Sequence, residues 1–202
     1  MPPTAVGFRA HTGWAAAVTV AGPPEAPEVI DRRRIELLAP GVPWEVFHAA
    51  VRAGGGAKGS ALLERATASA RVLATAALGE LIAELRDRGH KAVACGVTLS
   101  TRSEPVTLEE AMKSHTARHA GEGLLYREAI IHAAGVHKLR VLGVPERDLY
   151  GSANVATGRS LHALRQMVNE LGRDIGPPWT ADQKHAALIA WLALASRARK
   201  TR

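Results

Sequence analysis

The sequence predicts an α/β domain with a five-stranded mixed sheet and helices on both faces. Two observations lead to this prediction. Three short runs of strand type, separated by turn signals, occupy residues 4–38. Stretches with helical spacing of apolar residues then alternate with two short apolar runs, as in strand–helix units. Three antiparallel strands, a helix and two such units give the spatial strand order 3-2-1-4-5, numbered along the chain.

The composition fits one globular domain. The 202 residues are 47% hydrophobic and 22% charged, and the single Cys95 excludes an internal disulfide and makes a cysteine-ligated metal site a poor fit. No uninterrupted apolar run approaches the roughly 20 residues that a membrane span needs. The first residues lack the pattern of a signal peptide. We therefore expect a single domain over residues 1–202, a cytoplasmic location and no membrane partner.

The formal net charge is +7, and a basic tail over residues 197–202 carries four positive side chains. Such a tail attracts nucleic acid and other polyanions. It is also typical of a solvated chain end, which reads no base sequence. Basic tails are common, so the sequence favours the second interpretation.

The first three strands are expected at residues 4–11, 14–20 and 27–38. Thr12 and Gly13 supply the first turn, and the Gly-Pro-Pro run at 22–24 supplies the second.

The third strand carries a run of charge from Asp31 to Glu36, with arginines at 32–34. Charge on both faces is typical of an edge strand, where it opposes sheet-to-sheet association. The arginines therefore have a structural explanation that does not involve nucleic acid.

Helices dominate the middle of the chain. A short helix is expected at residues 44–52, a flexible glycine-rich break at 53–59 and a long helix at 60–88, capped by Ser60. The break is not a phosphate-binding loop, because Lys58 precedes a glycine instead of following one and no strand leads into it.

The second half contains the two strand–helix units. A buried strand is expected at residues 91–99 and a fifth strand at 138–144. Between them, a capping box of Thr107 and Glu110 opens a helix to about residue 134, with a bend near Gly121 and Gly123.

Two further helices complete the expected domain. The first covers residues 159–171, and the second follows a capping box of Thr180 and Gln183.

Two short motifs lie at the two ends of this arrangement. The first hairpin reads VGFRAHTGW over residues 6–14, and the last helix reads DQKHAALIA over residues 182–190. The hairpin resembles the G-[IV]-D-x-x-x-x-G-W opening of RuvC-type resolvases and their relatives. The helix is similar to the D-x-x-[DH]-A-[AL]-x-x-A segment that ends those domains. The resemblance implies a ribonuclease H-like fold, and between the two ends the order of elements agrees with it.

The resemblance also implies a nuclease site, from which this sequence departs. The family holds two divalent metals with carboxylates on the first strand, near the fourth strand and on the last helix. Here Phe8 takes the first-strand position, Arg9 stands beside it, and no acid follows the fourth strand before Glu104. Only Asp182 and His185 match, and Asp182 also suits the first turn of a helix. Hard divalent metals need several oxygen ligands, so we expect no two-metal nuclease.

A polar stripe lies on the helix after the fourth strand. His115, His119, Glu122 and Tyr126 are spaced four, three and four residues apart, so they share one helical face. Two histidines at this spacing can bind zinc, with Glu122 as third ligand or as a general base. The alternative is an ordinary polar, partly buried face.

Polar residues also follow the expected parallel strands, whose carboxyl ends border the ligand crevice in open α/β sheets. Arg102 and Arg147 could bind phosphate or carboxylate in bidentate fashion, and His119 with Glu122 or Glu146 could perform acid–base chemistry. Strand ends are also simply where polar residues emerge. The candidate anion-binding residues are His11, Thr12, Ser100, Arg102 and Arg147.

Three functions stay open. The favoured one is a ribonuclease H-like domain that binds nucleic acid or a nucleotide without two-metal cleavage. The second is a hydrolase or transferase whose catalytic residues are His119, Glu122 and Glu146. The third is a non-catalytic interaction module that pairs with a second copy through its helices.

Overall fold

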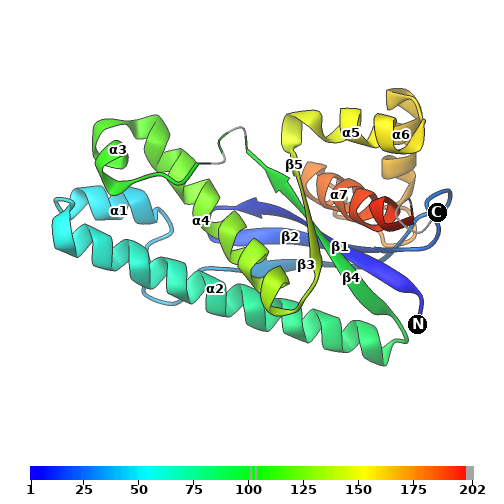
Figure 1. Cartoon of the computed structure of the whole chain (residues 1–202), viewed down its shortest axis with the longest axis horizontal. Coiled ribbons are helices and arrows are strands. Elements are labelled where there is room, and N and C mark those ends of the chain that lie inside the picture. Colours follow the sequence, from blue (N-terminus) through cyan, green and yellow to red (C-terminus); the bar gives the residue numbers. More distant parts are fainter. Residues whose placement is uncertain (101, 103, 199–202) are drawn as a thin grey trace.

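The computed structural model describes residues 1–100, 102 and 104–198, with side chains up to residue 196. The predicted basic tail at 197–202 therefore lies outside the described side chains. One mixed sheet has the order β3-β2-β1-β4-β5, as the sequence predicts (Figure 1). Its strands are β1 (Pro3–His11), β2 (Trp14–Ala21), β3 (Glu28–Glu36), β4 (Lys91–Leu99) and β5 (Arg140–Pro145).

Helices cover both faces of this sheet (Figure 1). The long helices α2 and α4 lie on one face, and α5, α6 and α7 lie on the other. Each face has its own apolar core. The helices are α1 (Val46–Arg52), α2 (Gly56–Asp87), α3 (Leu108–Lys113), α4 (His115–Val136), the 3-10 turn η1 (Glu146–Asp148), α5 (Leu149–Thr157), α6 (Leu161–Glu170) and α7 (Ala181–Ala198).

The strand β3 lies at the edge of the sheet, as predicted from its charge run at residues 31–36. The arginines of this run bond to other groups of the molecule, which supports their structural interpretation. Arg33 bridges Asp31 and Glu84, with nitrogen–oxygen distances of 2.7 and 2.6 Å. Arg32 donates to the backbone carbonyls of residues 176–178, before α7. These side chains attach the edge strand to α2 and to the α6–α7 connection.

The largest differences from the sequence prediction are at the ends of the long helices. The long helix α2 begins at Gly56, not at Ser60, because the glycine-rich stretch forms its first turn: the Gly59 amide donates to the Gly55 carbonyl over 3.0 Å. The predicted helix at 107–134 is two helices. The chain breaks at Ser114, whose extended backbone ends α3 and whose hydroxyl caps α4 by accepting from the Ala117 amide.

A further difference is α5, which the sequence did not predict. It has no side-chain N-cap and is closed by Gly158 in the left-handed conformation. The predicted capping box of Thr107 and Glu110 is complete, because the two residues bond reciprocally. Half of the second box is present: the Thr180 amide donates to the Gln183 side chain over 2.9 Å, but the Thr180 hydroxyl accepts from the Asp182 amide.

The helix α2 is long and apolar enough, by length and composition alone, to cross a membrane. In the fold it packs against the sheet and α4 through one stripe of small and aliphatic residues. A core helix of a globular domain passes the same test. The buried stripe consists of Ala66, Ala70, Ala74, Leu78, Leu81 and Leu85.

The contact between α7 and the middle of the sheet is very close. Gly7 on β1 and Gly96 on β4 are register partners, and both face α7. A Cβ atom on Gly7 would lie 1.9 Å from the Ala186 carbonyl oxygen, and one on Gly96 would lie 2.5 Å from that of Ile189. The helix backbone thus rests directly on two glycines.

We expect Gly7→Ala to destabilise the fold by at least about 2 kcal/mol, because the obstacle is helix backbone that no side-chain rotation can remove. Gly151→Ala in α5 is the matched control, since a Cβ there meets nothing within 4 Å. It should be neutral or should stabilise by up to about 1 kcal/mol. Urea unfolding followed by circular dichroism measures both. Equal stabilities of the two variants would contradict the close-packing argument.

Candidate functional site

The charged residues nearest the carboxyl ends of the parallel strands form one cluster. β1 supplies Arg9 and His11, η1 supplies Glu146 directly after β5, and α7 supplies Asp182 and His185. This edge of the sheet, with these five side chains, is called the rim below.

Arg9 lies at the centre of the rim and binds both carboxylates. Its Nη2 and Nε atoms donate to the two oxygens of Glu146 over 2.8 and 3.1 Å, a bidentate arrangement. Its Nη1 atom donates to Asp182. The Arg9 side chain is 21% exposed, so these bonds are partly shielded from water.

Two histidines complete the cluster. His11 Nε2 lies 2.9 Å from Asp182 Oδ1, and the His11 ring stacks on Trp14 with centroids 4.3 Å apart. His185 Nδ1 lies 3.3 Å from Glu146 Oε1. Each carboxylate therefore touches Arg9 and one histidine.

The charges in the rim stabilise one another. Partial burial opposes ionisation of Glu146 and Asp182, but the bonds from Arg9 and the histidines outweigh it and lower the pKa of both carboxyls. The same carboxylates raise the pKa of Arg9 against its own burial. Burial lowers the pKa of His185 by more than the attraction of Glu146 raises it, so the neutral imidazole is favoured.

The position of Arg9 corrects one expectation. The sequence comparison assigned the first-strand carboxylate position to Phe8, but Phe8 is buried in the core on the α2 side of the sheet. Side chains alternate along a strand, so the residue that faces α7 beyond Gly7 is Arg9. A guanidinium thus occupies the place from which a β1 carboxylate would face Asp182.

The rim residues do not fit the two divalent metals that the fold implies. Among the described residues, no carboxylate on β1 or β4 joins Glu146 and Asp182, and both of these are already bonded to a cation. A divalent ion would have to displace Arg9 and would still have few oxygen ligands.

The other predicted anion-binding residues do not join this cluster. Arg102 pairs with Glu110 over 3.0 Å, and Ser100 donates to the Arg102 carbonyl over 2.8 Å, so both stabilise the loop before α3. Thr12 lies in the turn after β1. Arg147 is exposed beside Asp148, at 3.5 Å.

The predicted catalytic set of His119, Glu122 and Glu146 is not brought together. Glu146 contacts Arg9 and His185. Glu122 is only 2% exposed and accepts hydrogen bonds from the amides of residues 46–48, the first turn of α1.

His119 belongs to a second cluster, away from Glu146. Its ring lies 4.5 Å from that of His115, as helical spacing predicts, and 4.8 Å from that of His48 on α1 (centroid distances). Sequence reasoning missed His48, because nothing near it in the chain marks it as a partner of α4.

Arg127 is a further residue that sequence reasoning missed. It is half-buried on α4, and Glu128 and Glu146 both attract it electrostatically. Burial is the main influence on Arg127 and lowers its pKa. No carboxylate in the described part of the chain lies within ion-pair distance of its guanidinium. A partly desolvated cation without an ion-pair partner is suited to bind an anion.

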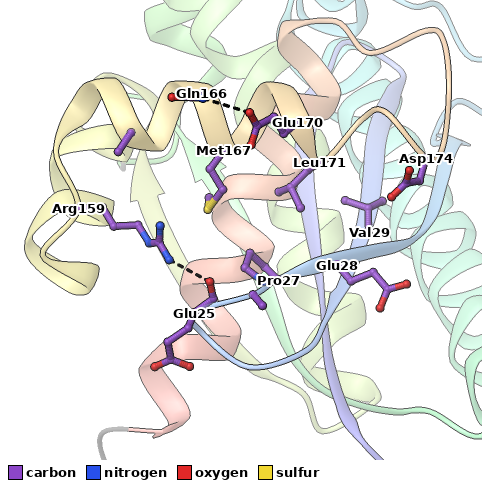
Figure 2. A pocket seen from close by; sticks show the side chains of 12 residues that line it. Glu25, Pro27, Glu28, Val29, Arg159, Gln166, Met167, Glu170, Leu171 and Asp174 are labelled. Carbon is purple, nitrogen blue, oxygen red and sulfur yellow. Dashed lines mark hydrogen bonds between the residues drawn. The ribbon is translucent and has the colours of Figure 1, made fainter.

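A hollow elsewhere on the molecule is lined mainly by carboxylates among its charged residues. It lies between the β2–β3 turn and α6, with a volume of about 510 Å³ (Figure 2). Its single lining cation, Arg159, donates to the Glu25 carbonyl over 2.9 Å. An acidic surface of this kind repels phosphate, so this hollow is a poor anion site. Its lining carboxylates are Glu25, Glu28, Glu170 and Asp174.

We expect Arg9→Met to lower stability by about 2 kcal/mol at neutral pH, because two partly buried carboxylates lose their cation. The folded pKa values of Glu146 and Asp182 are lowered, so the benefit of Arg9 is present above the unfolded values near about 4 and is lost as pH falls through the folded ones. The deficit of the variant should therefore shrink in acid.

Urea unfolding over a pH series measures this deficit. The control is Arg147→Met, an exposed arginine whose loss should change stability by less than about 0.5 kcal/mol. A deficit that stays constant down to acid pH would contradict the assigned ion pairs.

Comparison with known proteins gives a fold but no close relative. No protein-family model matches the chain, and no curated protein matches its sequence. A structure of Thermus thermophilus RuvC is similar over 98% of this chain and 97% of its own, with a TM-score of 0.53 and 13% identity.

A second structure, T. thermophilus RuvC in complex with a Holliday junction substrate, is similar over 98% of this chain and 96% of its own, with a TM-score of 0.59 and 12% identity. With the sheet order and the helix layers, these likenesses show that the chain has a RuvC-like, ribonuclease H-like α/β fold.

Proposed function

We propose that this chain is a RuvC-like domain that binds nucleic acid at the rim and does not cleave it by two-metal chemistry. One observation carries the proposal: the Arg9 guanidinium is bonded to both Glu146 and Asp182. A nuclease of this fold keeps metal ions between its carboxylates and the scissile phosphate. Here the Arg9 side chain bonds to both carboxylates and offsets one of their two negative charges.

The positive charge of Arg9 reduces the repulsion between the rim carboxylates and a phosphate group. Bare carboxylates repel the phosphate backbone, and metal ions normally remove that repulsion. With Arg9 in place, the repulsion is reduced without a metal. Arg127 and Arg147 add positive charge close to Glu146 and could bind phosphate oxygens.

Two further facts support nucleic acid as the ligand. One structurally similar protein was solved with a Holliday junction substrate. The net charge of +7 favours association with polyanions, although four of the positive side chains stand in the tail at 197–202. A cytoplasmic location and self-association remain predictions that accompany this proposal.

A second candidate, a hydrolase or transferase, is favoured by the contact between His185 and Glu146. The half-buried imidazole has a lowered pKa because of burial, and its Nδ1 atom lies 3.3 Å from the carboxylate, within ion-pair distance but without hydrogen-bond geometry. In this hydrolase or transferase, His185 would take the acid–base role that the sequence assigned to His119. Loss of a phosphate-ester hydrolysis in His185→Ala, with Arg9 intact, would favour it.

We expect the full chain to bind labelled branched DNA with an affinity that falls steeply as salt rises. Arg127→Ala should weaken binding about fivefold and lower the salt slope by about one, the effect of one lost phosphate contact. Fluorescence anisotropy at several salt concentrations measures both. Arg86→Ala is the control, because this exposed arginine stands at the end of α2, just before β4 begins and so at the opposite edge of the sheet.

A chain truncated before residue 197 separates the domain from its tail. If truncation abolishes binding while Arg127→Ala has no effect, the tail and not the rim binds DNA, and the proposal fails. Absence of binding at low salt also refutes it and favours the interaction module, which sedimentation would reveal as a dimer.

We expect no Mg²⁺- or Mn²⁺-dependent cleavage by the natural chain, and a gain of Mn²⁺ binding in Arg9→Asp. The substitution removes the blocking cation and adds a third carboxylate beside Glu146 and Asp182. Isothermal titration with Mn²⁺ measures this, with Arg147→Asp as the control for added charge. Metal-dependent cleavage by the natural chain would contradict the proposal.

A further inference from the structure

Three histidines meet between α1 and the start of α4. His48 comes from α1, and His115 and His119 come from successive turns of α4. Each offers one ring nitrogen, and these three atoms all lie within 4.8 Å of one another. The ring centroids are 4.5 to 5.2 Å apart, with the rings tilted or edge-on to each other rather than stacked.

His48 is held in a defined orientation. Its side chain is 10% exposed, and its Nδ1 atom lies 3.4 Å from Glu122 Oε1. The Glu122 carboxylate is itself fixed by the amides of α1. When Nδ1 carries the proton toward Glu122, the lone pair of His48 is on Nε2, the usual arrangement of a metal-binding histidine backed by a carboxylate.

The other two histidines can adjust. His115 and His119 are exposed, so their rings can rotate at little cost. Ligand nitrogens about 2.0–2.1 Å from a tetrahedral zinc ion lie roughly 3.3 Å apart. The ligand atoms are within 4.8 Å of one another before any adjustment, and rotation of the two exposed rings can bring them closer to this spacing.

We propose that His48, His115 and His119 form a binding site for a late first-row divalent metal, with Zn²⁺ as the probe and Glu122 as the supporting partner of His48. Three neutral imidazoles suit zinc and its neighbours and are poor ligands for Mg²⁺ or Ca²⁺. The exposed side of the cluster leaves a fourth position for water or an anionic ligand. This site uses none of the rim residues and does not depend on the proposed function.

The site would have a structural effect. α1 is only seven residues long, and α4 begins at His115, directly after the break at Ser114. A metal bound by all three histidines would join α1 to the first two turns of α4. The sequence-based ligand set of His115, His119 and Glu122 therefore changes in one member: His48 replaces Glu122, and Glu122 supports it.

The test uses the full chain without a histidine tag, freed of metal with a chelator. We expect one Zn²⁺ per chain by competition with a chromogenic chelator, and an intense visible Co²⁺ spectrum typical of four-coordinate geometry. His115→Ala and His119→Ala should each weaken Zn²⁺ binding at least about 100-fold. Both residues are exposed, so these variants should keep the fold.

His132→Ala is the matched control, because His132 is an exposed histidine further along the same helix. It should leave Zn²⁺ affinity unchanged. The proposal is overturned if the natural chain binds no Zn²⁺, or if His132→Ala weakens binding as much as His115→Ala does. An octahedral Co²⁺ spectrum with unchanged affinity in both ligand variants would likewise refute it.

Discussion

The backbone of α7 packs directly on Gly7 and Gly96 in the middle of the sheet, and this contact positions the residues of the rim. Because the helix backbone touches the sheet directly, α7 has almost no freedom to slide or rotate over β1. His185 precedes the contact residue Ala186, and Asp182 lies one turn before it. Arg9 lies two residues beyond Gly7 on the same face. The meeting of Arg9 and Asp182 follows from this packing.

That packing explains how one fold can hold opposite chemistries. The sheet and α7 set where a first-strand side chain and a last-helix side chain meet, whatever their charges are. With carboxylates on both sides the meeting point suits cations from solution. With Arg9 on one side the protein supplies the cation itself. The fold therefore fixes the place of the site, and one residue decides its electrostatic character.

Much of the architecture could be predicted from local patterns. Turn signals placed the hairpins, and the charge run from Asp31 to Glu36 marked the edge strand. The break at Ser114 was missed because the apolar spacing continues across it and only its capping geometry reveals it. In the rim, alternation along β1 points Arg9 and not Phe8 at Asp182, but the sequence does not say which face of the sheet α7 covers. His48 meets His119 only through tertiary packing, which no local pattern encodes.

The carboxylate of Glu122 has a consequence for how the domain assembles. Helix α1 has no side-chain cap of its own, and three of its first amides are satisfied by this one residue from α4. A helix of seven residues is too short to persist alone. α1 should therefore form late in folding, after α4 has docked, and it should be among the first segments to open. The hydrogen-exchange rates of the Val46 and Phe47 amides would then report on the attachment of α4 rather than on α1 itself.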